Sequence, residues 1–182
     1  MNSSVAQNFR SPGALARFFL TTLVGLALDL WTKAYAFATL SSGVIAVPHH
    51  HFEIVGAREH VVIPGWLAFR LTVNQGAVFG IGQGQRGLFI GISIAAIAFL
   101  TYLFATSGRQ RFYQFLLGLL LAGVMGNMID RIRLGYVRDM ICTLSRWPKL
   151  FPYIFNVADI MLCCGVGLMI YNSLFHTRRR SS

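Results

Sequence analysis

The sequence predicts a membrane protein that is mainly α-helical, with four transmembrane helices and a small extramembrane β-like platform between the first two. Three observations support this fold class. The 182 residues are 55% hydrophobic, with a mean hydropathy of +0.58, which is too apolar for an ordinary soluble domain. Four apolar runs approach the roughly 20 residues that a helix needs to cross a bilayer. The segment between the first two runs instead has strand-like pieces separated by proline and glycine. We therefore expect a single membrane domain, residues 1–182.

The four membrane spans are expected at residues 18–39, 88–106, 112–129 and 157–175. Residues 1–17 are polar and basic, and we expect them to lack regular structure up to Pro12. This leader is not predicted to be a cleavable signal peptide, because the apolar run after it is too long and contains Asp29 and Lys33.

Residues 40–87 form the expected platform. Phe52–Val55 and Trp66–Val73 have the composition and alternation of short strands. The other two connections differ in length: residues 107–111 form a short basic link, and residues 130–156 form a longer connection that carries five lysine and arginine residues.

An even number of spans places both termini on one side of the membrane and the connections 40–87 and 130–156 on the other. Lysine and arginine are nearly balanced between the sides, with seven on the terminal side and eight on the loop side. The short basic link and the tail Arg178–Arg180 favour cytoplasmic termini, because short flanks weigh most in setting orientation. The net charge of +10 is then expected to meet anionic lipid rather than nucleic acid.

The placement of the acids is the strongest functional signal. The chain has only six, yet Asp29 lies inside an apolar run, and Asp130, Asp139 and Asp159 fall at the loop-side ends of spans or between them. A carboxylate in or near lipid is costly unless it is paired, protonated or hydrated. Asn127, Lys33 and these acids are expected at one level of one membrane face, and two carboxylates held there would equip an aspartyl hydrolase.

Each polar group also has a purely structural interpretation. Asp29 and Lys33 have the i,i+4 spacing of a helix ion pair, and Asn156 with Asp159 could form a helix N-cap. Asn127, Asp130 and Arg131 could be a capped helix end with an ion pair, and the segment Asn74–Gly76 could be an ordinary turn. The convergence of all these groups on one face is what the structural interpretations leave unexplained.

No metal site or cofactor is predicted. Cys142, Cys163 and Cys164 are interpreted as small apolar packing residues. Consecutive histidines, as in the run His49–His51, fit one metal ion poorly, so we interpret that run as solvated or facing lipid headgroups.

These polar segments resemble the motifs of the lipoprotein signal peptidase family, also called signal peptidase II. The resemblance covers nearly the whole chain and follows the order of the family's motifs, which here are Asp29–Lys33, Asn74–Gly80, Gly126–Arg131, Gly135–Asp139 and Phe155–Asp159. Two positions depart from the family pattern: Val78 stands where alanine is usual, and Met140 where phenylalanine is usual.

The resemblance implies an aspartic endopeptidase that cleaves bacterial prolipoproteins just before a cysteine carrying a diacylglyceryl group. It implies a multi-pass protein of the inner membrane with its active site at the periplasmic face, and Asp139 and Asp159 as the catalytic pair. Supporting roles are expected for a set of neighbours in the same motifs: Asp29, Lys33, Asn74, Gly76, Asn127, Asp130, Arg131 and Asn156. Among these, Asp130 is expected to fix Arg131. The resemblance also implies that the protein's partners are the diacylated substrate and membrane lipid, and we expect the protein to be a monomer.

The main alternative is a small transport or channel subunit that uses intramembrane acids as a proton relay. That function favours acids near the middle of the membrane, whereas Asp130, Asp139 and Asp159 are expected at one edge. A haem-binding subunit would place histidines inside spans, and all five histidines lie outside the expected spans. The Gly-x-Gly-Asp motif of other intramembrane aspartyl proteases is absent from the sequence.

Overall fold

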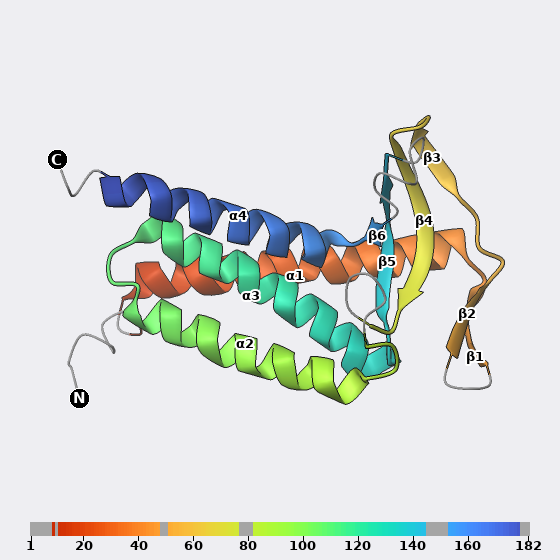
Figure 1. Cartoon of the computed structure of the whole chain (residues 1–182), viewed down its shortest axis with the longest axis horizontal. Helices are drawn as coiled ribbons and strands as arrows, with labels where there is room; N and C mark the ends of the chain where they lie inside the picture. Colours follow the sequence, from red (N-terminus) through yellow and green to blue (C-terminus); the bar gives the residue numbers. More distant parts are fainter. Residues whose placement is uncertain (1–8, 10, 48–50, 77–81, 145–152, 179–182) are drawn as a thin grey trace. The chain divides into compact units, whose positions relative to one another are not determined.

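The computed structural model describes residues 9, 11–47, 51–76, 82–144 and 153–178. Its elements are the helices and strands of Figure 1: α1 Pro12–Leu40, β1 Gly43–Val47, β2 His51–Val55, β3 His60–Ile63, β4 Leu67–Asn74, α2 Arg86–Thr106, α3 Arg111–Leu134, β5 Val137–Thr143, β6 Ile154–Phe155 and α4 Val157–Arg178.

Four helices are long and apolar enough to cross a membrane: Pro12–Leu40, Arg86–Thr106, Arg111–Leu134 and Val157–Leu174. Together with the small antiparallel sheets, they confirm the predicted fold class. The first helix begins at Pro12 rather than at the expected Phe18. Ser11 caps this end, since its Oγ accepts a hydrogen bond from the Ala14 amide at 3.4 Å, and proline suits the first position of a helix.

The chain divides into two compact units. The helical unit consists of Met1–Ala27, Ile92–Gly126 and Ala158–Ser182, and the platform unit consists of Leu28–Gly91 and Asn127–Val157.

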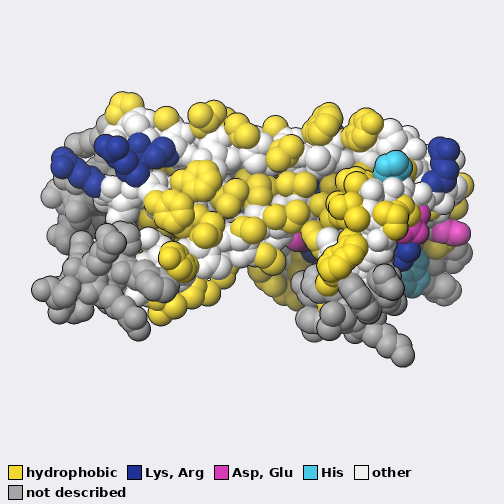
Figure 2. All heavy atoms as spheres, turned by 90° about the horizontal axis from the view of Figure 1, so that it is seen from above, with side chains coloured by type: hydrophobic (Ala, Val, Ile, Leu, Met, Phe, Trp, Pro, Cys, Tyr) yellow, Lys and Arg dark blue, Asp and Glu magenta, His cyan; other side chains and the backbone are white. Residues whose placement is uncertain are grey.

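In the helical unit, parts of all four helices run side by side (Figure 1). Their core is formed by large apolar side chains, and the Phe18 and Phe104 rings stack with their centroids 4.2 Å apart. The outer faces of the helices are also apolar, with Leu20, Leu23 and Phe99 more than half exposed. Figure 2 shows hydrophobic side chains gathered over the helices. Helices that are apolar on all sides suit a lipid environment.

Small residues bring the helices of this unit close together. A Cβ at Gly118 would lie 2.6 Å from the Phe18 carbonyl oxygen, and the Thr22 hydroxyl donates to the Gly118 carbonyl at 3.1 Å. A Cβ at Gly123 would lie 2.7 Å from the Ala158 carbonyl oxygen. Backbones can approach this closely only where side chains are minimal.

In the platform unit, β1 and β2 form an antiparallel hairpin, and β3, β4, β5 and β6 form a four-stranded antiparallel sheet in that order (Figure 1). Ala36, Leu71 and Met140 form its small apolar core. Strands β2 and β4 confirm the two strand predictions in residues 40–87. The sequence did not predict β5 and β6, which lie within the connection 130–156.

The prediction for two of the cysteines was wrong. Cys142 is buried as expected, but Cys163 and Cys164 are exposed on α4. A membrane helix can be apolar on the faces that meet lipid, so apolar surroundings in the sequence do not imply burial.

Candidate active site

Asp139 is a buried carboxylate that two asparagine side chains hold in place. It lies on β5 opposite Thr72 of β4, and only 2% of its surface is exposed. Its Oδ1 accepts a hydrogen bond from Asn156 Nδ2 at 2.6 Å, and its Oδ2 accepts one from Asn74 Nδ2 at 3.2 Å. Two amides from different elements therefore fix the position of both carboxylate oxygens.

Asn74 is oriented by the turn that follows β4. The Gly76 amide donates to Asn74 Oδ1 at 3.0 Å, which is the local bond of an Asx turn. Because the amide oxygen is occupied in this way, the amide nitrogen is the group that faces Asp139. The turn interpretation of Asn74–Gly76 is therefore correct, and the turn also serves the carboxylate. The remaining part of that motif, residues 77–80, lies outside the described residues.

Lys33 organises a second, deeper part of the site. Its Nζ lies 2.8 Å from Asp29 Oδ2, 3.0 Å from Asn127 Oδ1 and 3.5 Å from Asp130 Oδ2. Both side chains of the Asp29–Lys33 pair are fully buried. The i,i+4 ion pair predicted from the sequence is confirmed, and Lys33 in addition joins α1 to α3.

Lys33 also reaches Asp139 through a chain of hydrogen bonds. An ammonium group can only donate, so Asn127 must present its Oδ1 to Lys33. The same oxygen accepts a hydrogen bond from Asn156 Nδ2 at 3.2 Å, and Asn156 Nδ2 also donates to Asp139. The lysine thereby determines which end of the Asn127 amide faces Asn156, and through it which end of the Asn156 amide faces Asp139.

The expected pairing of Asp130 with Arg131 was wrong. Asp130 is 1% exposed and binds Arg138 instead: Arg138 Nη2 donates to Asp130 Oδ1 at 2.7 Å, and the Arg138 backbone amide donates to Oδ2 at 3.0 Å. Adjacent residues on a helix point in different directions, whereas β5 brings Arg138 back alongside the end of α3. Arg138 was not singled out from the sequence, although it stands directly before Asp139.

Arg131, near the end of α3, contacts Gly76 and Phe89 instead of Asp130. Its Nη2 donates to the Gly76 carbonyl at 2.9 Å, and its guanidinium lies 4.9 Å from the centre of the Phe89 ring. Arg131 therefore connects α3 to the Asn74–Gly76 turn and to the first turn of α2. Phe89 was likewise not anticipated from the sequence.

Tyr136 and Phe52 pack together at the start of β5. Their ring centroids are 4.7 Å apart, and Gly135, with φ 88°, makes the turn that leads from α3 into the strand. Burial raises the pKa of the Tyr136 hydroxyl, an effect that the nearby Arg138 opposes. The hydroxyl therefore stays protonated over a wider pH range than that of a free tyrosine.

Asp159 is the third residue of α4 and lies in its first turn, where the helix dipole favours a negative charge. It is half-buried and belongs to the helical unit. The other nine predicted site residues lie in the platform unit, where hydrogen bonds and ion pairs connect them.

No metal centre is evident in the described part of the chain, where no three of the histidine, cysteine and acidic side chains are grouped to hold an ion. His51 lies exposed on β2, and His49 and His50 lie outside the described residues.

Comparison with known proteins gives a consistent result. Residues 21–175 match the family described as signal peptidase (SPase) II. The chain is 31% identical over 175 residues to a lipoprotein signal peptidase of Burkholderia mallei (strain SAVP1), covering 92% of this chain and 93% of the relative. It is 33% identical over 149 residues to that of Clostridium tetani (strain Massachusetts / E88), covering 81% of this chain and 86% of the relative. A solved bacterial membrane enzyme superposes with a TM-score of 0.70 at 33% identity, covering 87% of each chain.

Proposed function

The chain belongs to the signal peptidase II family and is thus a membrane-embedded peptidase, and from this premise we propose its substrate and its mechanism. The substrate is a bacterial prolipoprotein that carries a diacylglyceryl group. The enzyme is an aspartic endopeptidase that cuts the signal peptide just before the lipidated cysteine.

Asp139 and Asp159 are proposed as the catalytic pair. The observation that carries this proposal is the hydrogen bond from Asn156 to Asp139. Asn156 directly precedes α4, and Asp159 lies three residues further along the chain, in the first turn of that helix. The short, helical connection supports a common site for the two carboxylates.

The pair acts on one water molecule. Two nearby carboxylates hold one proton more readily than two negative charges. The ionised carboxylate accepts a proton from water as the water oxygen attacks the scissile carbonyl. The protonated carboxyl donates a hydrogen bond to the carbonyl oxygen and then transfers a proton to the leaving amine as the C–N bond breaks.

Asp139 is assigned the role of base. Asn74 and Asn156 both donate to it, and donors favour the ionised form of a carboxylate. The start of α4 also favours a charged Asp159, but the shared proton must reside on one member of the pair, and we assign it to Asp159 because Asp139 has the two amide donors. Lys33 and Asn127 act as positioning residues, because they orient Asn156 without needing to touch the substrate.

The site is proposed to open at the periplasmic face of the inner membrane, with both termini in the cytoplasm and the connections 40–87 and 130–156 outside. Membrane lipid and the acyl chains of the substrate would contact the exposed apolar faces of the helices. One copy of the chain is proposed to be sufficient for activity, because the proposed groups all come from one chain.

The decisive experiment compares single-atom changes in the two carboxylates. Asp139→Asn and Asp159→Asn should each reduce cleavage of a diacylated prolipoprotein by at least about 10³-fold, because each leaves the pair without either its base or its acid. Glu53→Gln on the exposed face of β2 makes the same chemical change elsewhere and should retain full activity.

Wild-type enzyme should leave the unlipidated form of the same substrate uncut. Turnover by Asp139→Asn or Asp159→Asn within tenfold of wild type would remove that residue from the mechanism. Equal cleavage of lipidated and unlipidated substrate would refute the proposed substrate class.

A further inference from the structure

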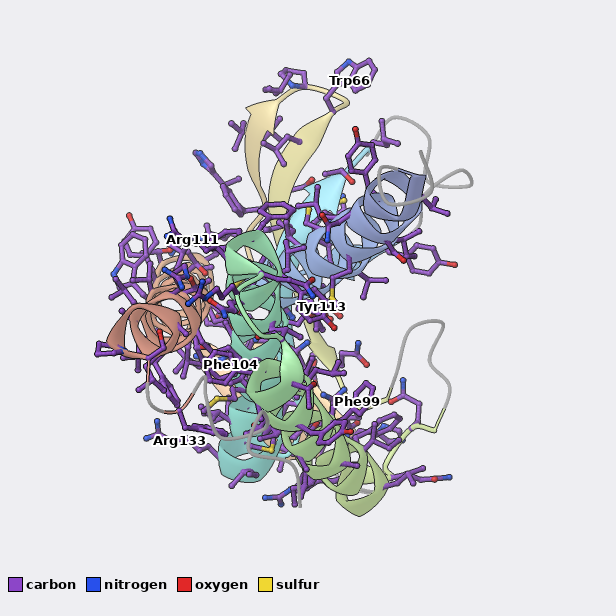
Figure 3. The ribbon with its side chains drawn as sticks, turned by 90° about the vertical axis from the view of Figure 1, so that its left-hand side faces the viewer. Trp66, Phe99, Phe104, Arg111, Tyr113 and Arg133 are labelled. Atoms are coloured by element: carbon purple, nitrogen blue, oxygen red, sulfur yellow. The ribbon has the colours of Figure 1, made fainter. Side chains whose placement is uncertain are left out.

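An arginine-lined cavity lies in the helical unit at the end where α2 connects to α3. Its volume is about 570 Å³, and its lining residues are Ser11, Ala14, Arg17, Gly108, Arg109, Arg111 and Gln114. We call this cavity the arginine pocket. Three guanidinium groups thus come from three segments: α1, the α2–α3 link and the start of α3. Figure 3 looks onto this end and shows Arg111 where α3 begins, beside α1.

The positive charge of the arginine pocket is not balanced locally. Asp159 is the only acid in the sequence of the helical unit. It lies in the first turn of α4, roughly 20 Å along that helix from Asn172, which borders a neighbouring cavity. Among the described residues, the ion pairs do not include Arg17, Arg109 or Arg111.

The pocket is also preorganised. Gln114 is 1% exposed, its Nε2 donates to the Gly108 carbonyl at 2.8 Å, and its Oε1 accepts a hydrogen bond from Arg17 Nε at 3.0 Å. This buried amide fixes Arg17 through Nε, and within the described part of the chain no hydrogen bond or ion pair occupies its two terminal nitrogens, which can therefore face a ligand. A guanidinium group held in this way suits the oxygens of a phosphate.

The neighbouring cavity indicates that the phosphate belongs to a lipid. About 430 Å³ in volume, it shares Arg109 and Arg111 with the arginine pocket and is also lined by Phe112 and Tyr113. Aromatic side chains are typical of the membrane–water interface. The nearby surface of α1 is apolar, with Leu20 62% exposed, so a headgroup in the pocket could continue into acyl chains along the helices.

We propose that the arginine pocket binds the phosphate of an anionic phospholipid headgroup, at the end of the helical unit opposite the first turn of α4. This lipid site is separate from the proposed peptidase site and does not depend on its chemistry. Basic pockets between membrane helices are suited to such headgroups, and each arginine near an anionic lipid surface strengthens binding measurably.

The test is native mass spectrometry of the full chain, released from detergent after titration with phosphatidylglycerol. Arg109→Gln/Arg111→Gln should weaken phosphatidylglycerol binding at least about tenfold. The charge-preserving variant Arg109→Lys/Arg111→Lys should bind within about threefold of wild type. Arg58→Gln/Arg133→Gln removes two exposed charges from the platform unit and should bind like wild type.

Two further probes define the ligand. Zwitterionic phosphatidylcholine should bind at least about tenfold more weakly than phosphatidylglycerol, and inorganic phosphate should compete only at millimolar concentration. The proposal would be overturned if Arg109→Gln/Arg111→Gln bound phosphatidylglycerol as tightly as Arg58→Gln/Arg133→Gln does. It would also be overturned if the wild-type protein bound phosphatidylcholine and phosphatidylglycerol equally. Binding of inorganic phosphate at the pocket without phosphatidylglycerol binding would identify a free-anion site instead. The Asp139→Asn enzyme should retain lipid binding, which separates this outcome from the fate of the proposed function.

Discussion

Lys33 lies at the centre of the buried polar residues and contacts two carboxylates and one amide. Removing its charge would take a cationic partner at 2.8 Å from the buried Asp29 and one at 3.5 Å from the buried Asp130, which also binds Arg138. Breaking a buried ion pair from one side is far more costly than replacing both partners with apolar groups. Lys33 therefore supports both the stability of the platform unit and the orientation of Asn127.

Lys33→Met should lower the free energy of unfolding by roughly 3–5 kcal/mol, because it breaks a fully buried ion pair from one side. Asp29→Leu/Lys33→Leu should recover most of that loss but remain poorly active, because Lys33 no longer fixes Asn127, which orients Asn156 toward Asp139. Thermal unfolding in one detergent measures the first effect, and kcat/KM for lipidated substrate measures the second.

The pH profile of kcat/KM in Asp29→Leu/Lys33→Leu distinguishes the loss of Asn156 orientation from general damage to the fold. If Asn156 no longer donates reliably to Asp139, the ionised base is less favoured, and the acid limb of kcat/KM should move to higher pH. Wild-type kcat/KM with an unchanged profile in the folded double variant would return Lys33 to a purely structural role.

Metal independence is a second prediction at this scale. A two-carboxylate mechanism needs no ion, so strong chelators should leave kcat/KM within about twofold of the untreated enzyme. His49→Ser/His50→Ser/His51→Ser should behave in the same way. Activity that disappears with chelator and returns with added zinc would require a different mechanism.

The site residues show what a sequence can and cannot reveal. Spacing along one helix was enough to predict the Asp29–Lys33 pair, and local turn chemistry was enough to predict the Asn74–Gly76 turn. Arg138 was missed because its bond to Asp130 depends on how β5 returns beside α3. That path is set by packing and by the turn at Gly135, which no pattern in the neighbouring residues specifies.

The helices are held together by close backbone approaches at glycine, and Gly118 is the sharpest case. Alanine is normally favoured over glycine inside a helix by roughly 1 kcal/mol. At Gly118 the added methyl would meet the Phe18 carbonyl oxygen, whereas at Gly167 nothing lies within 4 Å of it. The same substitution should therefore have opposite effects at these two sites.

Gly118→Ala should destabilise the protein by roughly 1–3 kcal/mol, because the overpacked backbone must shift. Gly167→Ala should be neutral or slightly stabilising. Thermal unfolding midpoints measured in the same detergent provide the comparison. A Gly118→Ala midpoint equal to that of Gly167→Ala would show that the α1–α3 approach is loose.

The helices and strands differ in how readily the sequence predicts them. The four spans could be predicted because an apolar run of about 20 residues is typical of a transmembrane helix. Helices α1 and α3 nevertheless extend beyond the predicted ends. Strand β5 was missed because buried and half-buried residues do not alternate strictly along Val137–Thr143. A strand covered on parts of both faces loses the period-two signal.

At the scale of the whole molecule, the membrane orientation remains a prediction that labelling can check. In a variant with Cys142, Cys163 and Cys164 replaced by serine, Ser42→Cys should react with a membrane-impermeant maleimide added outside the cell. Ser181→Cys should react only after the membrane is opened, because the basic link and tail favour a cytoplasmic location. Labelling of Ser181→Cys in intact cells would invert the topology and remove the proposed function.

Sequence separation also has a consequence for how the enzyme becomes active. Asn74 and Asp139 are 65 residues apart, and α2 and α3 are both synthesised between them. At about 5–20 residues per second, translation of that interval takes roughly 3–13 s. During this time β4 has no β5 to pair with, and closing so long a loop is slow compared with forming a helix. The nascent chain must therefore synthesise α2 and α3 before Asp139 can meet Asn74, so the peptidase acquires its activity only after its first three helices have been made.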